Sequence, residues 1–277
     1  MNDSRLSLES IKGKQPSSDP EREEKLFAIL NNVLQPNQFL NPTEAATKID
    51  DLAPKFQETD RDDGKRELDI ENFMAQLWGL LFGTMQLVPR EHPGQARAIS
   101  LLSALCQVGG DLGVKAENGP LRWRHLPCLT QYLIQDFWRW RTSFAEQEWI
   151  NLNSFAARLL QSGLFDAENG VSDLELLASN QFGKLDGDYA QEDEGDLALL
   201  EEWISHAGAT ILQTARRNSL EANATNPGRF TRSRENVLSI ADWERWQRRL
   251  LELGVDADCD LSPRCLMLAH KMELLER

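Results

Sequence analysis

The stretch that decides the fold is Trp149-Ile150-Asn151-Leu152-Asn153-Ser154-Phe155-Ala156-Ala157-Arg158-Leu159-Leu160. At about 100° per residue, its apolar side chains cover most of a helix circumference, and only Asn151, Ser154 and Arg158 share the remaining arc. A helix that is apolar almost all round belongs in the interior of a protein. Asn153 falls within the apolar stripe, so we expect its amide to be buried and to need hydrogen-bond partners. The stretch therefore predicts a Trp-rich core helix over residues 149–163.

Helix start signals recur along the rest of the chain. Capping residues precede apolar runs of helical period at Asp19, Asn41, Ser172, Ser239 and Ser262, and three of these five are followed by proline. No run alternates between polar and apolar residues as a half-buried strand does, and residues 111–126 are expected to form a loop. The pattern predicts an all-α fold of about ten helices. We expect a single compact domain over residues 19–277, preceded by a disordered tail over residues 1–18.

The tryptophans on the expected helices are large core fillers or, alternatively, the lining of an apolar ligand cavity. These residues are Trp138, Trp149, Trp203, Trp243 and Trp246.

Composition narrows the classes of function. The formal net charge of -14 argues against broad binding to a phosphate backbone, so we expect no nucleic-acid partner. No apolar run reaches the roughly 18 residues of a membrane span, and no secretory signal is visible at the N-terminus. The four cysteines form no Cys-x-x-Cys pair, which favours a reducing cytoplasm, with the nucleus as the alternative. The histidines lack metal-ligand spacing, so we expect no metal and no cofactor.

Five segments carry a family likeness. They are His92-Pro93-Gly94-Gln95, Trp123-Arg124-His125-Leu126-Pro127, Trp149 to Leu159, Trp203-Ile204-Ser205-His206-Ala207-Gly208, and Trp243-Glu244-Arg245-Trp246-Gln247-Arg248-Arg249-Leu250. In this order they resemble the fungal domain-of-unknown-function 3632 family. The resemblance implies a fungal, helical, intracellular protein, and it hints at secondary metabolism because some members look like neighbours in biosynthetic gene clusters. It supplies no catalytic residue.

Several residues are candidates for chemistry. His206 could act as a general base if a carboxylate oriented it, or it could be a buried structural histidine. Asn153 and Arg158 could hold a substrate carboxylate or amide, or serve local capping and surface pairing. Trp149, Trp203 and Gly208 could line a ligand site, although close helix packing equally explains a mid-helix glycine.

One basic segment stands out on this acidic chain. Within residues 216–234, only Glu221 opposes five arginines, which are Arg216, Arg217, Arg229, Arg232 and Arg234. The segment could dock an acidic partner, or it could be a solvated loop.

Two functions therefore compete. The first is a non-catalytic helical scaffold or interaction protein with a protein partner, which the lack of any catalytic motif favours. The second is an enzyme or carrier for an apolar small molecule. It requires residues such as Asn153, Trp203 and His206 to converge on one cavity.

Overall fold

The structure, a computed structural model, describes residues 5–12, 19–37, 40–55, 63–108, 111–116, 119–140, 144–164, 173–186, 194–224, 238–255 and 261–277. Within these residues the chain forms ten α-helices, so the predicted all-α fold is confirmed. Contacts along the chain divide it into two compact units, Met1–Phe155 and Ala156–Arg277. Each unit is described by itself, and the single domain over residues 19–277 stays a prediction.

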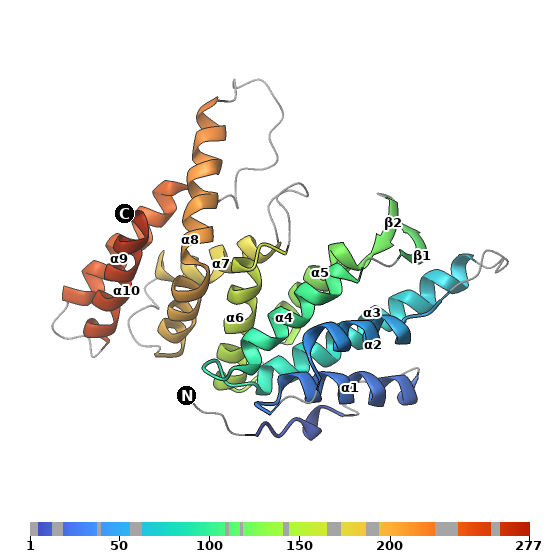
Figure 1. Cartoon of the computed structure of the whole chain (residues 1–277). Helices are drawn as coiled ribbons and strands as arrows, with labels where there is room; N and C mark the ends of the chain where they lie inside the picture. Colours follow the sequence, from blue (N-terminus) through green and yellow to red (C-terminus); the bar gives the residue numbers. More distant parts are fainter. Residues whose placement is uncertain are drawn as a thin grey trace. The chain divides into compact units, whose positions relative to one another are not determined.

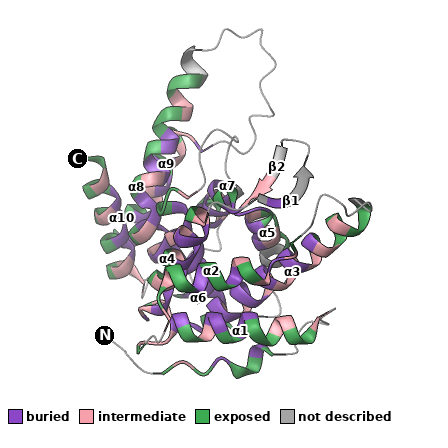
Figure 2. Cartoon of the chain, turned by 45° about the vertical axis from the view of Figure 1, so that its right-hand side comes forward, coloured by how far each residue is buried: buried purple, intermediate pink, exposed green. Residues whose placement is uncertain are grey.

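The first unit contains α1 to α5 and most of α6 (Figure 1). The bounds are α1 (Pro20–Leu34), α2 (Pro42–Leu52), α3 (Asp63–Leu87), α4 (Gly94–Gln107), α5 (Leu129–Trp140) and α6 (Glu146–Gln161). Helices α1, α2 and α4 pack against one another, and α3 packs against α1 and α5. Because of this packing, α1 is buried along one side and exposed along the other, as Figure 2 shows.

The predicted start signals at Asp19 and Asn41 form the expected caps. The Asp19 carboxylate accepts a hydrogen bond from the Arg22 amide at 3.0 Å, and the Asn41 side chain accepts one from the Glu44 amide at 2.9 Å. Each cap satisfies an amide that the first turn of a helix leaves without a partner. Proline follows both caps at the first helical position, where the missing N–H costs nothing.

Residues 111–126 differ from the expected loop. They contain an antiparallel hairpin of β1 (Asp111–Ala116) and β2 (Gly119–Arg122), followed by the short 3-10 helix η2 (Trp123–His125). The register of the two strands shifts between Asp111 and Lys115. Such an irregularity interrupts the alternation of polar and apolar residues by which a strand is recognised in sequence.

The N-terminal segment also differs from the expected disordered tail. Its residues 5–12 include the 3-10 helix η1 (Glu9–Ile11), and both Leu8 and Ile11 are buried. This segment contacts α3, because its two apolar side chains find a surface there that the sequence pattern does not reveal. The rest of the predicted tail lies outside the described residues.

The second unit contains α7 (Asp173–Phe182), η5 (Gly183–Asp186), α8 (Glu194–Ala224), α9 (Ile240–Val255) and α10 (Ser262–Glu276). Helices α9 and α10 form an antiparallel hairpin that packs against α8 (Figure 1). The Ser239 hydroxyl accepts a hydrogen bond from the Asp242 amide, and the Asp242 carboxylate accepts one from the Ser239 amide. This reciprocal capping box begins α9 where the sequence predicts.

The predicted cap at Ser262 is wrong, because Leu261 is the N-cap of α10 and the Ser262 hydroxyl donates to the Gly254 carbonyl instead. Ser172 lies outside the described residues.

The predicted Trp-rich core is confirmed in both units. Trp78 and Trp123 are fully buried in the first unit, and Trp203 and Trp243 in the second. The side chain of Trp138 lies outside the described residues. None of the described helices is long and apolar enough to cross a membrane.

Candidate functional site

The segment His92 to Gln95 is built into the junction between α3 and α4. The Gln95 side chain has no exposed surface, and its amide nitrogen donates to the carbonyl oxygens of Val88 at 2.8 Å and Asn151 at 3.2 Å. The Gly94 amide donates to Nδ1 of His92 at 2.9 Å. A Cβ at Gly94 would lie only 3.1 Å from the carbonyl oxygen of Leu34, so glycine allows α4 to begin against α1. These contacts assign the segment a structural role.

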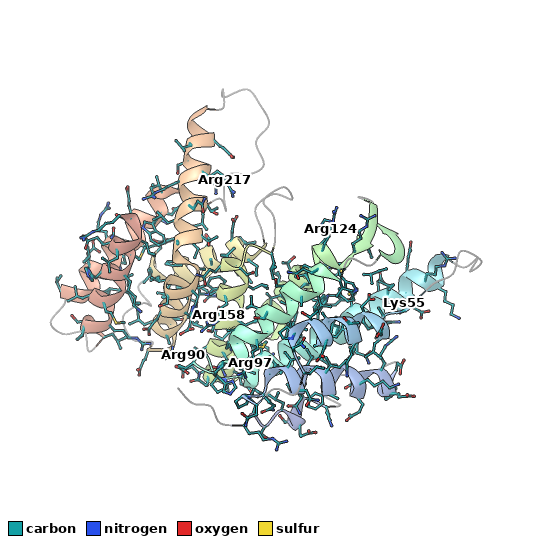
Figure 3. All side chains as sticks on the ribbon, viewed as in Figure 1. Lys55, Arg90, Arg97, Arg124, Arg158 and Arg217 are labelled. Atoms are coloured by element: carbon teal, nitrogen blue, oxygen red, sulfur yellow. The ribbon has the colours of Figure 1, made fainter. Side chains whose placement is uncertain are left out.

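Arg97, in the first turn of α4, joins this helix to the end of α1 (Figure 3). Its guanidinium donates to the carbonyl oxygens of Leu34, Gln35 and Pro36 at 3.2, 2.6 and 3.2 Å. Helix carbonyls at a C-terminus have no partner within the helix. Arg97 therefore acts as a C-terminal cap for α1, supplied by another helix.

Asn151 is buried, although the helical wheel places it on the polar arc of its helix. It is 3% exposed, its Oδ1 accepts from the Arg90 amide at 3.0 Å, and its Nδ2 donates to the Gln86 carbonyl at 2.8 Å. Oδ1 also accepts from the Gln147 side chain at 2.9 Å. Asn151 thus connects α6 to the end of α3 and the turn that follows it. The polar side of α6 at this position faces hydrogen-bond partners in the protein, not solvent.

Asn153 is fully buried as predicted, and its Nδ2 donates to the carbonyl oxygen of Trp149 at 2.9 Å. Trp149 is 8% exposed and stacks on Phe144, with ring centroids 6.1 Å apart. Arg158 is half-buried and lies in the part of α6 that belongs to the second unit (Figure 3). Of the three candidates on α6, Trp149 and Asn153 therefore belong to the first unit and Arg158 to the second.

The segment Trp123 to Pro127 also holds the first unit together. The Trp123 indole donates to the Asp50 carboxylate at 2.7 Å, and the Trp78 indole donates to the Pro127 carbonyl at 2.9 Å. The two indoles meet edge to face at 6.4 Å. Leu126, which lies between Trp123 and Pro127 in sequence, adopts a φ of 43°, which is rare for a residue with a side chain.

In the second unit, His206 has the carboxylate that its candidate role requires. Its Nε2 lies 3.4 Å from Oε2 of Glu202, one turn earlier on α8. Glu202 is buried, whereas His206 keeps about a quarter of its side chain exposed. The two groups are within ion-pair distance, and a carboxylate close to a partly exposed imidazole is a pairing that acid–base catalysis uses. The spacing of four residues is visible in the sequence and could have indicated this pair.

Trp203 and Gly208 lie on the packed side of α8. Trp203 is fully buried. A Cβ at Gly208 would lie 2.5 Å from Cδ1 of Leu275 and 3.8 Å from the ring of Trp243. The glycine therefore permits a close approach between α8 and α10, which offsets its mid-helix cost of about 1 kcal/mol.

Charged residues fix the start of α9. Arg245 donates two hydrogen bonds to Asp186, at 2.8 and 3.0 Å, and one to Asp242 at 2.7 Å. The bonds to Asp186 are the main reason that the pKa of Arg245 is raised. Desolvation raises the pKa of Asp242, but hydrogen bonds from Ser239 and Arg245 outweigh it, and the net pKa is lowered.

The structure describes two of the five arginines of the basic segment, and each makes a contact within the second unit. Arg216 donates to the Glu276 carbonyl at 3.3 Å, and Arg217 lies 3.8 Å from Oε1 of the buried Glu175 (Figure 3). The other three arginines of the segment, Arg229, Arg232 and Arg234, lie outside the described residues. Two of the five arginines thus tie α8 to α10 and α7.

The sequence interpretation missed an apolar surface on α9 and α10. Five of the seven large apolar side chains that are exposed in the described residues lie on these two helices. They are Leu251, Val255, Leu266, Met267 and Leu274, with exposed fractions between 40% and 76%. The signal was present in the sequence, because Leu251 and Val255 lie off the stripe formed by Trp243, Trp246 and Leu250. Among the described residues, no group of His, Cys, Asp and Glu could hold a metal ion.

Comparison with known proteins gives a family and no activity. A search of curated proteins and a search of solved structures each found no match. A family model described as a protein of unknown function, DUF3632, matches residues 78–250. The matched residues include Gln95, Trp123 and Asn151, whose side chains hold helices of the first unit together. The chain belongs to the DUF3632 family.

Proposed function

We propose that this protein is a non-catalytic helical scaffold, and that the outer face of the α9–α10 hairpin binds a second copy of the chain. The concentration of exposed apolar side chains on these two helices supports the proposal. Monomeric proteins rarely expose contiguous large apolar patches, and such patches mark interaction sites. Figure 2 shows exposed residues along α10.

Three of the side chains lie near the end of α9. Leu251 and Val255 are one turn apart on α9, and Leu266 of α10 lies against Gly254, where a Cβ would come within 2.6 Å of it. These three residues form the centre of the proposed interface. Met267 and Leu274 extend it along α10.

The surroundings of this centre favour a second copy. The exposed Arg248 precedes it by one turn on α9, and Asp256, Asp258 and Asp260 follow Val255 in the sequence. A two-fold axis that pairs two copies of α9 antiparallel near residue 253 brings Leu251 of one copy to Val255 of the other. The contact is then isologous, because each copy contributes the same surface.

Sedimentation velocity on the full chain tests the proposal. We expect a dimer with a dissociation constant in the micromolar range, because five side chains supply less area than the roughly 1,200–2,000 Å² of a stable interface. The double variant Leu251→Glu, Val255→Glu should be monomeric at about 100 μM. The matched control is Leu68→Glu, which charges an exposed leucine in the first unit and should leave the dimer intact. A monomeric natural chain, or a double variant that still dimerises, would contradict the proposal.

A second candidate function is the binding or conversion of an apolar small molecule near His206. The Glu202 carboxylate, 3.4 Å from Nε2 of His206, supports it, because an acid–base imidazole needs a carboxylate nearby. Native mass spectrometry of the protein from its own host tests this candidate. A bound mass of a few hundred daltons that the variant His206→Gln loses would support it, and a bare chain would count against it.

A further inference from the structure

We propose that the first unit has a binding surface for linear peptide segments, and that residues 5–12 of the chain occupy it in cis. The surface is formed by Glu24, Phe27 and Gln35 at α1 and by Gly83 on α3. It is distinct from the α9–α10 face, and its evidence is independent of that proposal. The N-terminal segment runs beside α1 in Figure 1.

The backbone of the segment is recognised by one side-chain amide. The Leu6 amide donates to Oε1 of Gln35 at 2.9 Å, and Nε2 of Gln35 donates to the Leu6 carbonyl at 3.1 Å. Gln35 therefore pairs with both polar groups of one residue, as a neighbouring strand would. Such pairing binds extended backbone regardless of the side chain at that position.

Side chains of the segment provide selectivity. Leu8 and Ile11 are 2% and 5% exposed. A Cβ at Gly83 would lie 3.3 Å from Cγ2 of Ile11, so the absence of a side chain at Gly83 leaves the space that Ile11 fills. Burying two aliphatic side chains contributes the main apolar part of the affinity.

Lys12 ends the recognised stretch. Its ammonium group lies 2.8 Å from the Glu24 carboxylate and 4.6 Å from the centre of the Phe27 ring. A cation over an aromatic face, next to a carboxylate, selects lysine or arginine at this position. The recognised pattern is thus an apolar residue, a second apolar residue three positions later, and a basic residue directly after it.

The receptor side is held in place without the segment. Nε2 of Gln35 also donates to Oδ1 of Asn31 at 2.6 Å, and the Gln35 carbonyl accepts from Arg97 at 2.6 Å. Neither contact involves residues 5–12. A preorganised receptor group loses little entropy on binding, which favours recognition of a segment from another chain.

The tether makes the natural segment a strong competitor. Residues 13–18 connect it to Asp19 at the start of α1, and so short a covalent tether gives an effective concentration of about the millimolar range. A partner that carries the same pattern must displace the cis segment, or bind when that segment is released. We therefore expect weak binding to the natural chain and tighter binding once the cis segment is disabled.

Fluorescence polarisation measures this difference. The probe is a labelled synthetic peptide of residues 5–12, and the receptor is the full chain with Leu8→Asp and Ile11→Asp. We expect saturable binding at least about tenfold tighter than to the natural chain. Adding Gly83→Leu to the receptor should abolish binding, because the new side chain fills the space of Ile11. A peptide with the same two aspartates serves as the control and should not bind.

Circular dichroism and thermal unfolding establish that each receptor is folded. A folded double variant that does not bind the peptide, or that binds it equally well with Gly83→Leu, overturns the proposal. If the double variant does not fold, a protease site placed within residues 13–18 of the natural chain decides the matter. After cleavage, native mass spectrometry should show the labelled peptide replacing the cleaved segment. Failure of the peptide to exchange would show that residues 5–12 are a fixed part of the fold.

Discussion

Replacing Asn151 by alanine should destabilise the first unit strongly. The substitution removes Oδ1, which accepts from the Arg90 amide, and Nδ2, which donates to the Gln86 carbonyl. Asn151 is only 3% exposed, so water cannot reach these groups without opening the junction between α3 and α6. Each of the two backbone groups left without a partner costs about 1–3 kcal/mol, which gives a loss of about 2–6 kcal/mol.

Urea unfolding followed by circular dichroism measures this loss. The matched control is Gln147→Ala, which removes an exposed donor to the same Oδ1 and should cost less than about 0.5 kcal/mol. The variant Asn151→Asp keeps the acceptor for Arg90 but lacks the donor for Gln86, so its cost should also exceed that of the control. A loss below about 1 kcal/mol for Asn151→Ala would refute the assignment of Asn151 as the residue that fixes this junction.

Three further changes test the packing and electrostatics of the two units. Trp123→Phe keeps the buried ring but removes the 2.7 Å hydrogen bond to Asp50, so it should lower the free energy of unfolding by about 1–3 kcal/mol in the same urea assay. Gly254→Ala should cost about 1–3 kcal/mol, because its Cβ would lie 2.6 Å from Leu266 and force α9 away from α10; a midpoint equal to that of the natural chain would contradict the contact. Asp242 has a lowered pKa in the folded chain, so its contribution is complete above its ordinary value of 3.8 and is lost as the pH falls through the folded-state pKa. Asp242→Asn should therefore destabilise the chain at pH 7 and much less at pH 3, as thermal unfolding at the two values would show.

The sequence by itself determined the helical class of the fold and the starting points of several helices. Asp19, Asn41 and Ser239 cap helices because a capping side chain and the amide that it binds are only two or three residues apart. The burial of Asn153 followed in the same way from the 3.6-residue period of its own helix. Such contacts are local, so they depend on the order of residues and on little else.

Only the tertiary structure decided which polar residues are buried and which apolar residues are exposed. Asn151 lies on the polar arc of α6, yet it is buried because a turn from residues 86–90 supplies its partners. Leu8 and Ile11 lie in a polar terminal stretch, yet they are buried because Gly83 leaves room beside α3. Leu251 and Val255 are exposed because α10 packs against the other side of α9. These outcomes depend on residues that are tens of positions apart in the sequence, and a periodic pattern reports only on the helix that carries it.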